Sequence, residues 1–361
     1  MVARILLVTF LAFARSTLQA WQMAPIDYSA ANEYVKVHYP HLHTGDYFRP
    51  STGPSTGADE PIFNGRLGVH DDRRGRLVPA SLAECGFALL KPPRAAQVDD
   101  WRDGDAVRAT YLPKLRQLIT DAVEQSPAHG KVSELIFWHM LVREQGAPYV
   151  GPSDAASSAV SRGPIAPMAH VDTDVNAYAG HADRLAQLVL ANQVIETGRA
   201  PFAGDLVEQL SGRRFCILNA WRNADNDHPI LRAPLALLAT RHSEVDGPWG
   251  RFPEHLPDHT RSRWYAFPRM ESEVLCFTQY DRKLGRPSEL WHCALSALEE
   301  APGSPPRRSF EVRALVLLEE TLPLQLDRWL PLPHNRPVLS HYESGQFCDE
   351  QACKRKAAPP L

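Results

Sequence analysis

The chain has 361 residues, of which 44% are hydrophobic and 22% charged, and this balance is typical of a globular protein rather than a disordered or fibrous one. Its 39 Lys and Arg residues against 42 Asp and Glu residues give a formal charge of -3, which argues against a surface that binds nucleic-acid phosphates. The 31 prolines exceed the average share of roughly 5%. Because proline interrupts helices, they favour strands and loops over a helical bundle.

The first twenty residues resemble a targeting segment. An apolar run from Ile5 to Ala14 follows Arg4, and the small residue Ala20 stands where a signal would be cut. The run is shorter than the roughly 20 residues that span a bilayer, so we expect no membrane span. It indicates either a cleaved signal or a mature N-terminal helix, and the location is therefore cytoplasmic, or secreted or organellar if residues 1–20 are a signal.

The elements that follow predict a mainly β protein. Residues 50 to 72 are rich in Gly, Pro and charge, and we expect a long surface segment there. Apolar residues at spacings of three and four predict helices from 106 to 123 and from 181 to 196, the second with Leu185, Leu188, Val189 and Ile195 on one face. Strand-like runs cover 135 to 142, 165 to 172, 215 to 221, 263 to 267, 274 to 280, 290 to 295 and 310 to 318.

Short strands bounded by Pro and Gly, with helices before and between them, favour a β-barrel or sandwich with flanking helices, an α+β arrangement. We expect a single domain over residues 21–320 and a Pro-rich, basic tail over 321–361. Cys216, Cys276 and Cys293 lie in apolar runs and are predicted to be buried thiols, whereas Cys348 and Cys353 in the tail could pair.

A His-x-Asp pair on a strand places both side chains on one face, where they can bind one metal ion. The chain holds this pair at His70, at His170 with Asp172, and at His181 with Asp183. His70 lies in a charged run that predicts a solvated turn, and His181 and Asp183 open a helix, where the charge favours the helix N-terminus. His170 and Asp172 end an apolar strand, which is where a barrel places its ligands.

A third metal ligand must come from another strand, and His292 is the best candidate. It lies in an apolar predicted strand, where a buried His needs a hydrogen-bond or metal partner. A core histidine without metal is the alternative. Two histidines and one carboxylate leave coordination positions open, which is the usual arrangement for non-haem Fe(II) oxygen chemistry.

A basic strand follows His292. Alternation places Arg307, Ser309, Glu311 and Arg313 on one face and the apolar residues around Phe310 on the other. Glu311 can balance one arginine, and the remaining charge suits a dicarboxylic co-substrate. An edge strand whose charged face meets solvent is equally compatible with the pattern.

Several motifs, in this order, resemble the fungal hydroxylase and desaturase family that includes gibberellin desaturase, the aspergillic acid cluster hydroxylase and the cephamycin methoxylation proteins. The resemblance covers about residues 67 to 318. Its motifs are Gly86-Phe-Ala-Leu, His170-Val-Asp172, Ile217-Leu-Asn-Ala-Trp-Arg222, Pro234-Leu-Ala-Leu, Arg263-Trp-Tyr, Glu273-Val-Leu-Cys-Phe, Tyr280-Asp281, His292 and Arg307-Arg-Ser-Phe-Glu-Val-Arg-Ala-Leu.

The family resemblance implies an Fe(II)/2-oxoglutarate-dependent oxygenase on a double-stranded β-helix, with its core at about 130–320. It implies that Fe(II) binds His170, Asp172 and His292, and that either Arg307 with Ser309, or Arg313, anchors 2-oxoglutarate. The reaction would use O2, release succinate, and hydroxylate, desaturate or cyclise a small molecule. Further candidates are Asn219 and Arg222 near the co-substrate, although alternation turns Arg222 away, and Trp221, Trp264, Tyr265 and Tyr280 in a substrate pocket.

The chain departs from the family pattern at Asn223, at Ala239-Thr240 and at Arg282. These changes leave the metal positions in place and put the substrate contacts in doubt. Two other functions use the same residues: a zinc hydrolase, which would activate a bound water, and a non-catalytic barrel that binds a small molecule.

Overall fold

The computed structural model describes residues 20–27, 59–71, 76–126, 128–148, 160–172, 182–239, 263–283 and 290–322. The apolar run from Ile5 to Ala14, His181, Thr240, Cys348 and Cys353 lie outside the described residues, as does the tail beyond residue 322.

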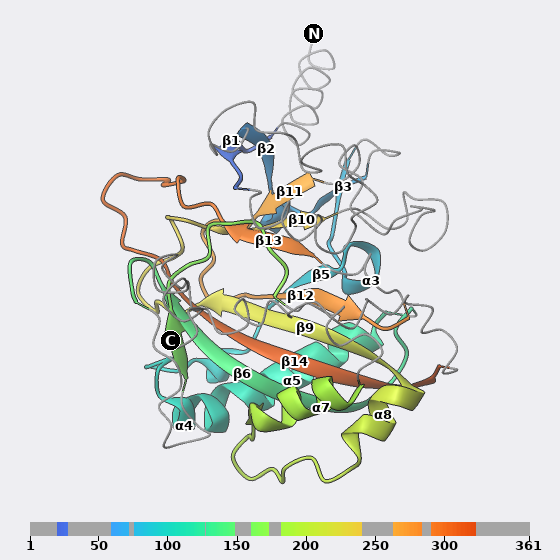
Figure 1. Ribbon diagram of the computed structural model, residues 1–361. Helices are drawn as coiled ribbons and strands as arrows, with labels where there is room; N and C mark the ends of the chain where they lie inside the picture. Colours follow the sequence, from blue (N-terminus) through green and yellow to red (C-terminus); the bar gives the residue numbers. More distant parts are fainter. Residues whose placement is uncertain are drawn as a thin grey trace, which may run out of the picture.

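Two β-sheets form the body of the described chain (Figure 1). The larger has the order β5-β12-β9-β14-β6-β7, and β8 pairs separately with β6. The smaller has the order β1-β2-β11-β10-β13. The strands of the larger sheet are β5 (Phe87–Leu90), β6 (Val132–Glu144), β7 (Ser161–Gly163), β8 (Gln193–Val194), β9 (Arg213–Asn223), β12 (Val274–Asp281) and β14 (Arg308–Thr321). The strands of the smaller sheet are β1 (Gln22–Pro25), β2 (Asp59–Asn64), β10 (Leu235–Ala239), β11 (Arg263–Ala266) and β13 (Trp291–Ala294).

Short helices and one small hairpin complete the fold, which is mainly β with few helices. The hairpin pairs β3 with β4. These elements are β3 (Val69–Asp71), β4 (Arg76–Val78), the 3₁₀ turns η2 (Gly65–Leu67) and η3 (Arg94–Ala96), α3 (Leu82–Cys85), α4 (Gly104–Ala106), the π-helical turn η4 (Val107–Tyr111), α5 (Leu112–Glu124), α7 (Ala182–Ala191) and α8 (Leu206–Gly212). No helix among the described residues is long and apolar enough to cross a membrane.

Side chains of β14 alternate between two buried faces. Phe310, Val312 and Ala314 pack into the core that α5 covers. Ser309, Glu311 and Arg313 take the opposite face and are also buried. Because β14 lies between β9 and β6, the alternative of a solvent-facing edge strand is wrong, whereas the predicted division of the two faces is confirmed.

The face of the larger sheet that carries Arg313 is covered in two ways. At one end α7 and α8 pack against it through a cluster that includes Leu185, Leu210 and Leu315. Toward the other end, apolar residues of both sheets meet in a shared core, with Phe277 and Leu275 from β12 and Leu237 from β10. The polar part of this face therefore lies between the two sheets.

Both predicted helices form. The Asp103 side chain accepts hydrogen bonds from the N–H groups of Asp105 and Ala106, which caps the first helical segment. In the second, α7 buries Leu185 and Val189 but ends at Ala191. Ile195, predicted on the same face, lies beyond the helix and is 37% exposed, because the chain turns into β8 and pairs with β6.

Two other predictions are wrong. Residues 165–172 are not a continuous strand: only Met168 and His170 make isolated bridges, to Asp27 and His292. Prolines at 164 and 167 have no N–H for a ladder, which is why the strand breaks up. The expected surface segment at 50–72 contains β2 and β3, and Ile62 of β2 is fully buried between β1 and β11.

Candidate metal centre

Three predicted ligands meet between the sheets. One ligand atom from each of His170, Asp172 and His292 lies within 4.8 Å of the other two. The Nε2 atom of His292 is 3.3 Å from Asp172 Oδ2, and that of His170 is 3.6 Å from Asp172 Oδ1. The His292 and Asp172 side chains are each 4% exposed, whereas that of His170 is 20% exposed, so the group is open to solvent on the His170 side.

A reciprocal backbone pair brings the two histidines together. The N–H of His170 donates to the carbonyl of His292 at 3.0 Å, and the N–H of His292 donates to the carbonyl of His170 at 2.9 Å. Residues paired in this way lie directly opposite each other across an antiparallel ladder. The two rings consequently lie close together, with their centroids 4.3 Å apart and their planes tilted by 47°.

Backbone carbonyls hold the Nδ1 atoms of both histidines. His170 Nδ1 is 2.8 Å from the carbonyl of Met168, and His292 Nδ1 is 3.3 Å from the carbonyl of Leu290. Since a carbonyl only accepts, a proton on Nδ1 suits each contact and would leave each Nε2, which faces Asp172, as the atom that binds a metal ion. Burial, and then the neighbouring His292, lower the pKa of His170, so its ring is neutral at pH 7 and suited to bind a metal.

Side chains from three adjacent strands hold Asp172. Gln279 of β12 accepts from the backbone N–H of Asp172 at 2.8 Å, Asn219 of β9 donates to Oδ2, and Nη2 of Arg313 lies 3.2 Å from Oδ1. Burial alone would raise the pKa of Asp172, but Arg313 and His292 outweigh it and hold that pKa well below its usual range. The carboxylate is therefore ionised.

Gln279 was not among the predicted site residues. Gln279 is the one amide side chain in a mostly apolar strand. Its position was the sequence signal for a polar contact, because a buried amide needs hydrogen-bond partners. The direct ion pair of Glu311 is with a third arginine, since its Oε2 lies 3.6 Å from Arg143 Nε on β6. Burial lowers the pKa of Arg307, and the charge of Glu311 nevertheless acts to raise it, as expected for a balancing carboxylate, whereas Arg313 faces Asp172.

Arg307 is a buried cation that makes no ion pair with any described residue. Its Nη1 donates to the carbonyl of Ala233 at 2.7 Å, and its guanidinium lies 5.3 Å from the centre of the Trp221 ring. Its Nε and the nearby Ser309 Oγ have no hydrogen-bond partner among the described residues. Burial, and then Arg143, lower the pKa of Arg307 to about 9, and a bound anion would offset this.

Arg222 does not belong to this group. Its guanidinium lies on the other face of β9, 4.2 Å from the centre of the Trp101 ring, and donates to Gln97. The alternation that predicted this direction is confirmed. A role for Arg222 in cofactor binding does not fit this position, because the sheet separates it from His170 and Asp172.

The predicted pocket aromatics divide between different faces. Trp221 and Tyr265 belong to the core shared by the two sheets, and Tyr280 packs on Phe215 beside α8. Trp264 lies on the opposite face of β11, in a separate core with Ile62. A pocket between the sheets therefore excludes Trp264.

The structure also places His70 differently from the prediction. It is 4% exposed and its ring meets Phe63 edge-on at 4.4 Å, so the predicted solvated turn is wrong. Burial of a hairpin strand, which charge density does not reveal, accounts for the difference. Its sequence partner, Asp72, lies outside the described residues.

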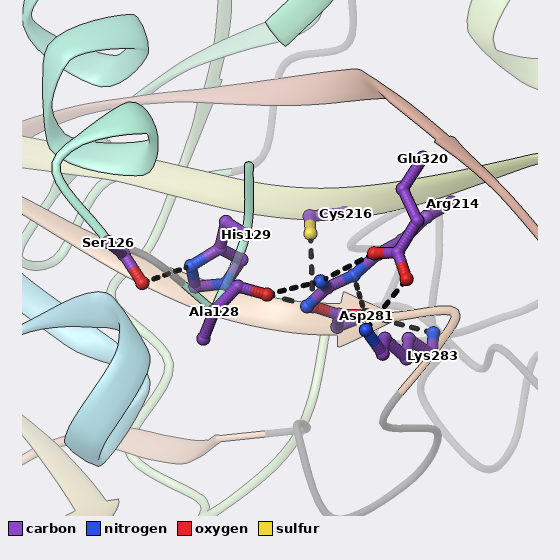
Figure 2. A network of polar contacts seen from close by, with 8 residues as sticks. All are labelled: Ser126, Ala128, His129, Arg214, Cys216, Asp281, Lys283 and Glu320. Carbon is purple, nitrogen blue, oxygen red and sulfur yellow. Dashed lines mark hydrogen bonds and ion pairs between the residues drawn. The ribbon is translucent and has the colours of Figure 1, made fainter. Parts of the chain in front are cut away.

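A second group of metal-ligating side chains lies in β9, β12 and the turn after α5 (Figure 2). Arg214 takes both oxygens of Asp281, with Nε to Oδ1 at 3.0 Å and Nη2 to Oδ2 at 2.6 Å. The Cys216 thiol donates to Asp281 Oδ2 at 3.2 Å, and His129 Nε2 lies 3.7 Å from the same oxygen. Burial and then Asp281 raise the pKa of Cys216, so the thiol is protonated and the group forms an ion-pair network centred on Asp281.

The prediction for the cysteines is confirmed within the described ranges. Cys216, Cys276 and Cys293 are buried and free, as is Cys85.

The sequence places the chain in an oxidoreductase-like class. Residues 63–317 match the family described as "Oxidoreductase/YMDC permease-like domain". This range is more than half of the chain, so the chain belongs to that family. No curated protein matches the sequence.

Several solved structures are similar in fold. "Iron and alpha-ketoglutarate-dependent endoperoxidase NvfI" is 18% identical, with a TM-score of 0.46 over 75% of this chain and 92% of that one. A single-residue variant of the same endoperoxidase is 16% identical, with a TM-score of 0.49 over 83% and 98%. The "non-heme alpha ketoglutarate dependent epimerase SnoN" is 15% identical, with a TM-score of 0.23 over 72% and 90%. At these values we base no functional argument on the likeness.

Proposed function

We propose that the protein is an Fe(II)/2-oxoglutarate-dependent oxygenase that hydroxylates, desaturates or cyclises a small organic molecule. One observation carries the proposal: one ligand atom from each of His170, Asp172 and His292 lies within 4.8 Å of the other two, and the Asp172 carboxylate is ionised. Two histidines and one carboxylate with open positions are the ligand set of non-haem Fe(II) oxygenases.

The strand order supports the proposed double-stranded β-helix. From β9 to β14 the chain crosses repeatedly between the two sheets: β9, β12 and β14 join the larger one, and β10, β11 and β13 join the smaller. The bridge at His170 extends the smaller sheet beyond β13. Successive strands that wind between two facing sheets in this way define the jelly-roll family of folds, to which the fungal hydroxylase and desaturase family belongs.

The surroundings of Arg307 support a role in binding 2-oxoglutarate. Arg313 already faces Asp172 at 3.2 Å, whereas Arg307 makes no ion pair with a described carboxylate, and the neighbouring Ser309 Oγ has no partner among the described residues. A buried guanidinium without an ion-pair partner is costly unless a ligand supplies one. We therefore assign the distal carboxylate of 2-oxoglutarate to Arg307 and Ser309.

In this proposal, bound iron with 2-oxoglutarate and O2 would supply oxidative decarboxylation to succinate and abstraction of hydrogen from the substrate. The protein supplies position and exclusion of water. With a metal bound at Nε2, the carbonyls of Met168 and Leu290 would accept the Nδ1 protons of His170 and His292 and so hold both rings in orientation. Asn219, Gln279 and Arg313 hold Asp172 in one orientation, the outer support that metal ligands commonly need.

The decisive experiment is an anaerobic titration of the full-length protein with Fe(II) and 2-oxoglutarate, followed by visible absorbance and then by succinate release in air. We expect one equivalent of iron, a weak charge-transfer band that needs both additions, and succinate in air. A zinc hydrolase would bind metal without response to 2-oxoglutarate, and a non-catalytic barrel would form the band but release no succinate. Either result would refute the oxygenase.

A further inference from the structure

A β-bulge in β6 lies beside the candidate metal centre. Met140 pairs with Val312 of β14, and the next pair joins Trp138 to Arg313, so His139 is the extra residue. Its φ is 57°, a conformation that costs a non-glycine residue roughly 1–3 kcal/mol and persists where the surroundings require it. The N–H of His139 donates to the carbonyl of Asn192 at 3.1 Å, which fixes the bulge to the end of α7.

Three buried nitrogen atoms at or next to the bulge lack hydrogen-bond partners. His139 Nδ1, Arg313 Nε and Trp138 Nε1 have no hydrogen-bond partner among the described residues. The Arg313 guanidinium lies 5.4 Å from the centre of the Trp138 ring. Each buried polar atom left unpaired costs about 1–3 kcal/mol, so these atoms call for a ligand or ordered water.

The charges near His139 determine the kind of partner. Burial lowers the pKa of His139 to about 3, and Arg313 and Arg143 lower it further, against the opposite effect of Asp172. The ring is thus neutral at pH 7. Arg143 and Arg313 already face carboxylates, Glu311 at 3.6 Å and Asp172 at 3.2 Å, but Arg313 Nε has no partner among the described residues and can only donate. The missing partner is therefore an acceptor, and a carboxylate would make the charge-assisted form of this hydrogen bond.

We propose that His139 and Arg313 bind a carboxylate of the organic substrate. This inference rests on the proposed function and names its substrate class, a carboxylic acid. The site differs from that of the co-substrate, because Arg307 and Arg313 are six residues apart on one strand, about 20 Å at the usual rise per residue. One carboxylate therefore cannot reach both guanidinium groups in their described positions.

Isothermal titration of the full-length, metal-free protein tests the site with cyclohexanecarboxylate and with cyclohexanecarboxamide, a neutral probe of the same shape. We expect saturable binding of the acid and at least about tenfold weaker binding of the amide. His139→Phe, which keeps a ring but removes both nitrogens, should weaken the acid about tenfold. His139→Gly, which suits the positive φ, gives the same comparison with less backbone strain.

The control variant is His228→Phe, because His228 is an exposed histidine in a loop and should leave both probes unchanged. In a parallel titration with Mn(II) and 2-oxoglutarate, His139→Phe should keep the co-substrate affinity within about twofold, a change too small for a lost charge-assisted hydrogen bond.

Equal binding of acid and amide, or no binding of the acid, would overturn the proposal. So would a His139→Phe variant that loses 2-oxoglutarate but not the acid. If 2-oxoglutarate fails to bind the parent protein, the proposed function fails, and the acid and amide comparison still decides the anion site.

Discussion

Asp172 is the residue on which the candidate centre depends. It exchanges hydrogen bonds with groups on β9, β12 and β14 while lying between two histidine Nε2 atoms. A carboxylate held from several sides keeps both oxygens in place before any metal arrives, and this lowers the entropy cost of binding. The histidines, by contrast, each depend on one carbonyl contact for their orientation.

Replacement of His292 tests the metal ligands. We expect His292→Ala to weaken Fe(II) binding by more than the roughly 10- to 100-fold that loss of an outer partner costs. His292 is buried against Phe277, with ring centroids 5.1 Å apart, so alanine also opens a cavity and should lower the free energy of unfolding by about 2 kcal/mol. The measurements are iron stoichiometry and urea unfolding.

His292→Gln keeps most of the volume and should lose iron with a smaller loss of stability. His228→Ala is the matched control, because that side chain is 56% exposed. A folded His292→Gln that retains stoichiometric iron would exclude His292 from the centre. Loss of iron in His228→Ala would move the centre elsewhere.

Arg307 and Arg313 should respond differently to lysine. We expect Arg307→Lys to raise the 2-oxoglutarate concentration needed for half-saturation by about tenfold or more, because an ammonium cannot reproduce the two-point contact of a guanidinium. Arg313→Lys should change it much less, since its described partner is Asp172. Titration of the Mn(II) protein with 2-oxoglutarate measures both.

Arg308→Lys serves as the neighbour control, because Arg308 projects from β14 toward Glu144 and is 41% exposed. If Arg313→Lys raises the requirement and Arg307→Lys does not, the assignment of the two arginines must be exchanged. Equal and small effects would remove β14 as the co-substrate anchor.

At the scale of the elements, side-chain contacts link β9 and β12 at two places. An ion pair links them at one end, and near the centre Asn219 of β9 and Gln279 of β12 both contact Asp172. Arg214 and Asp281 form a fully buried pair, with side chains 1% and 0% exposed, and Glu320 of β14 lies 3.1 Å from the same guanidinium. Removing one partner of such a pair leaves a buried charge without compensation.

We therefore expect Arg214→Met to lower the free energy of unfolding by about 3–5 kcal/mol, as measured by urea denaturation. Arg269 is the comparison, because its side chain is 69% exposed although its partner Glu300 is 13% exposed, and Arg269→Met should cost less than about 1 kcal/mol. A stable Arg214→Met variant, or zinc retained by the parent at His129, Cys216 and Asp281, would contradict the ion-pair assignment of Figure 2.

The elements also show what the sequence can and cannot predict. Alternation placed Arg313 and Phe310 on opposite faces, because side-chain direction along a strand is a local property. The stretch before His170 was misassigned since its backbone partner is His292, and long-range pairing overrides a local apolar pattern. Trp264 was placed in the pocket because composition does not reveal which face of β11 meets the other sheet.

At the scale of the whole molecule, the first described strand supports the metal centre from outside. The N–H of Ala169 donates to the carbonyl of Asp27 at 2.8 Å, and Met168 bridges Asp27. Ile26 is fully buried in the same core as Ala169. The segment 21–27 thus holds the irregular stretch that ends at His170, in place of the ladder that Pro164 and Pro167 prevent.

This arrangement gives a sharp prediction for shortened chains. A chain that begins at residue 20 should be soluble and bind iron like the full-length protein, since it keeps β1 and Asp27. A chain that begins at residue 28 should lose the burial of Ile26, worth about 1.5–3 kcal/mol, and should bind iron more weakly because the stretch before His170 loses its partner. Circular dichroism, thermal unfolding and iron stoichiometry of the three chains test this. If the chain from residue 20 already loses iron, the preceding residues are needed for metal binding. If a folded chain from residue 28 retains iron, His170 is positioned by β13 alone.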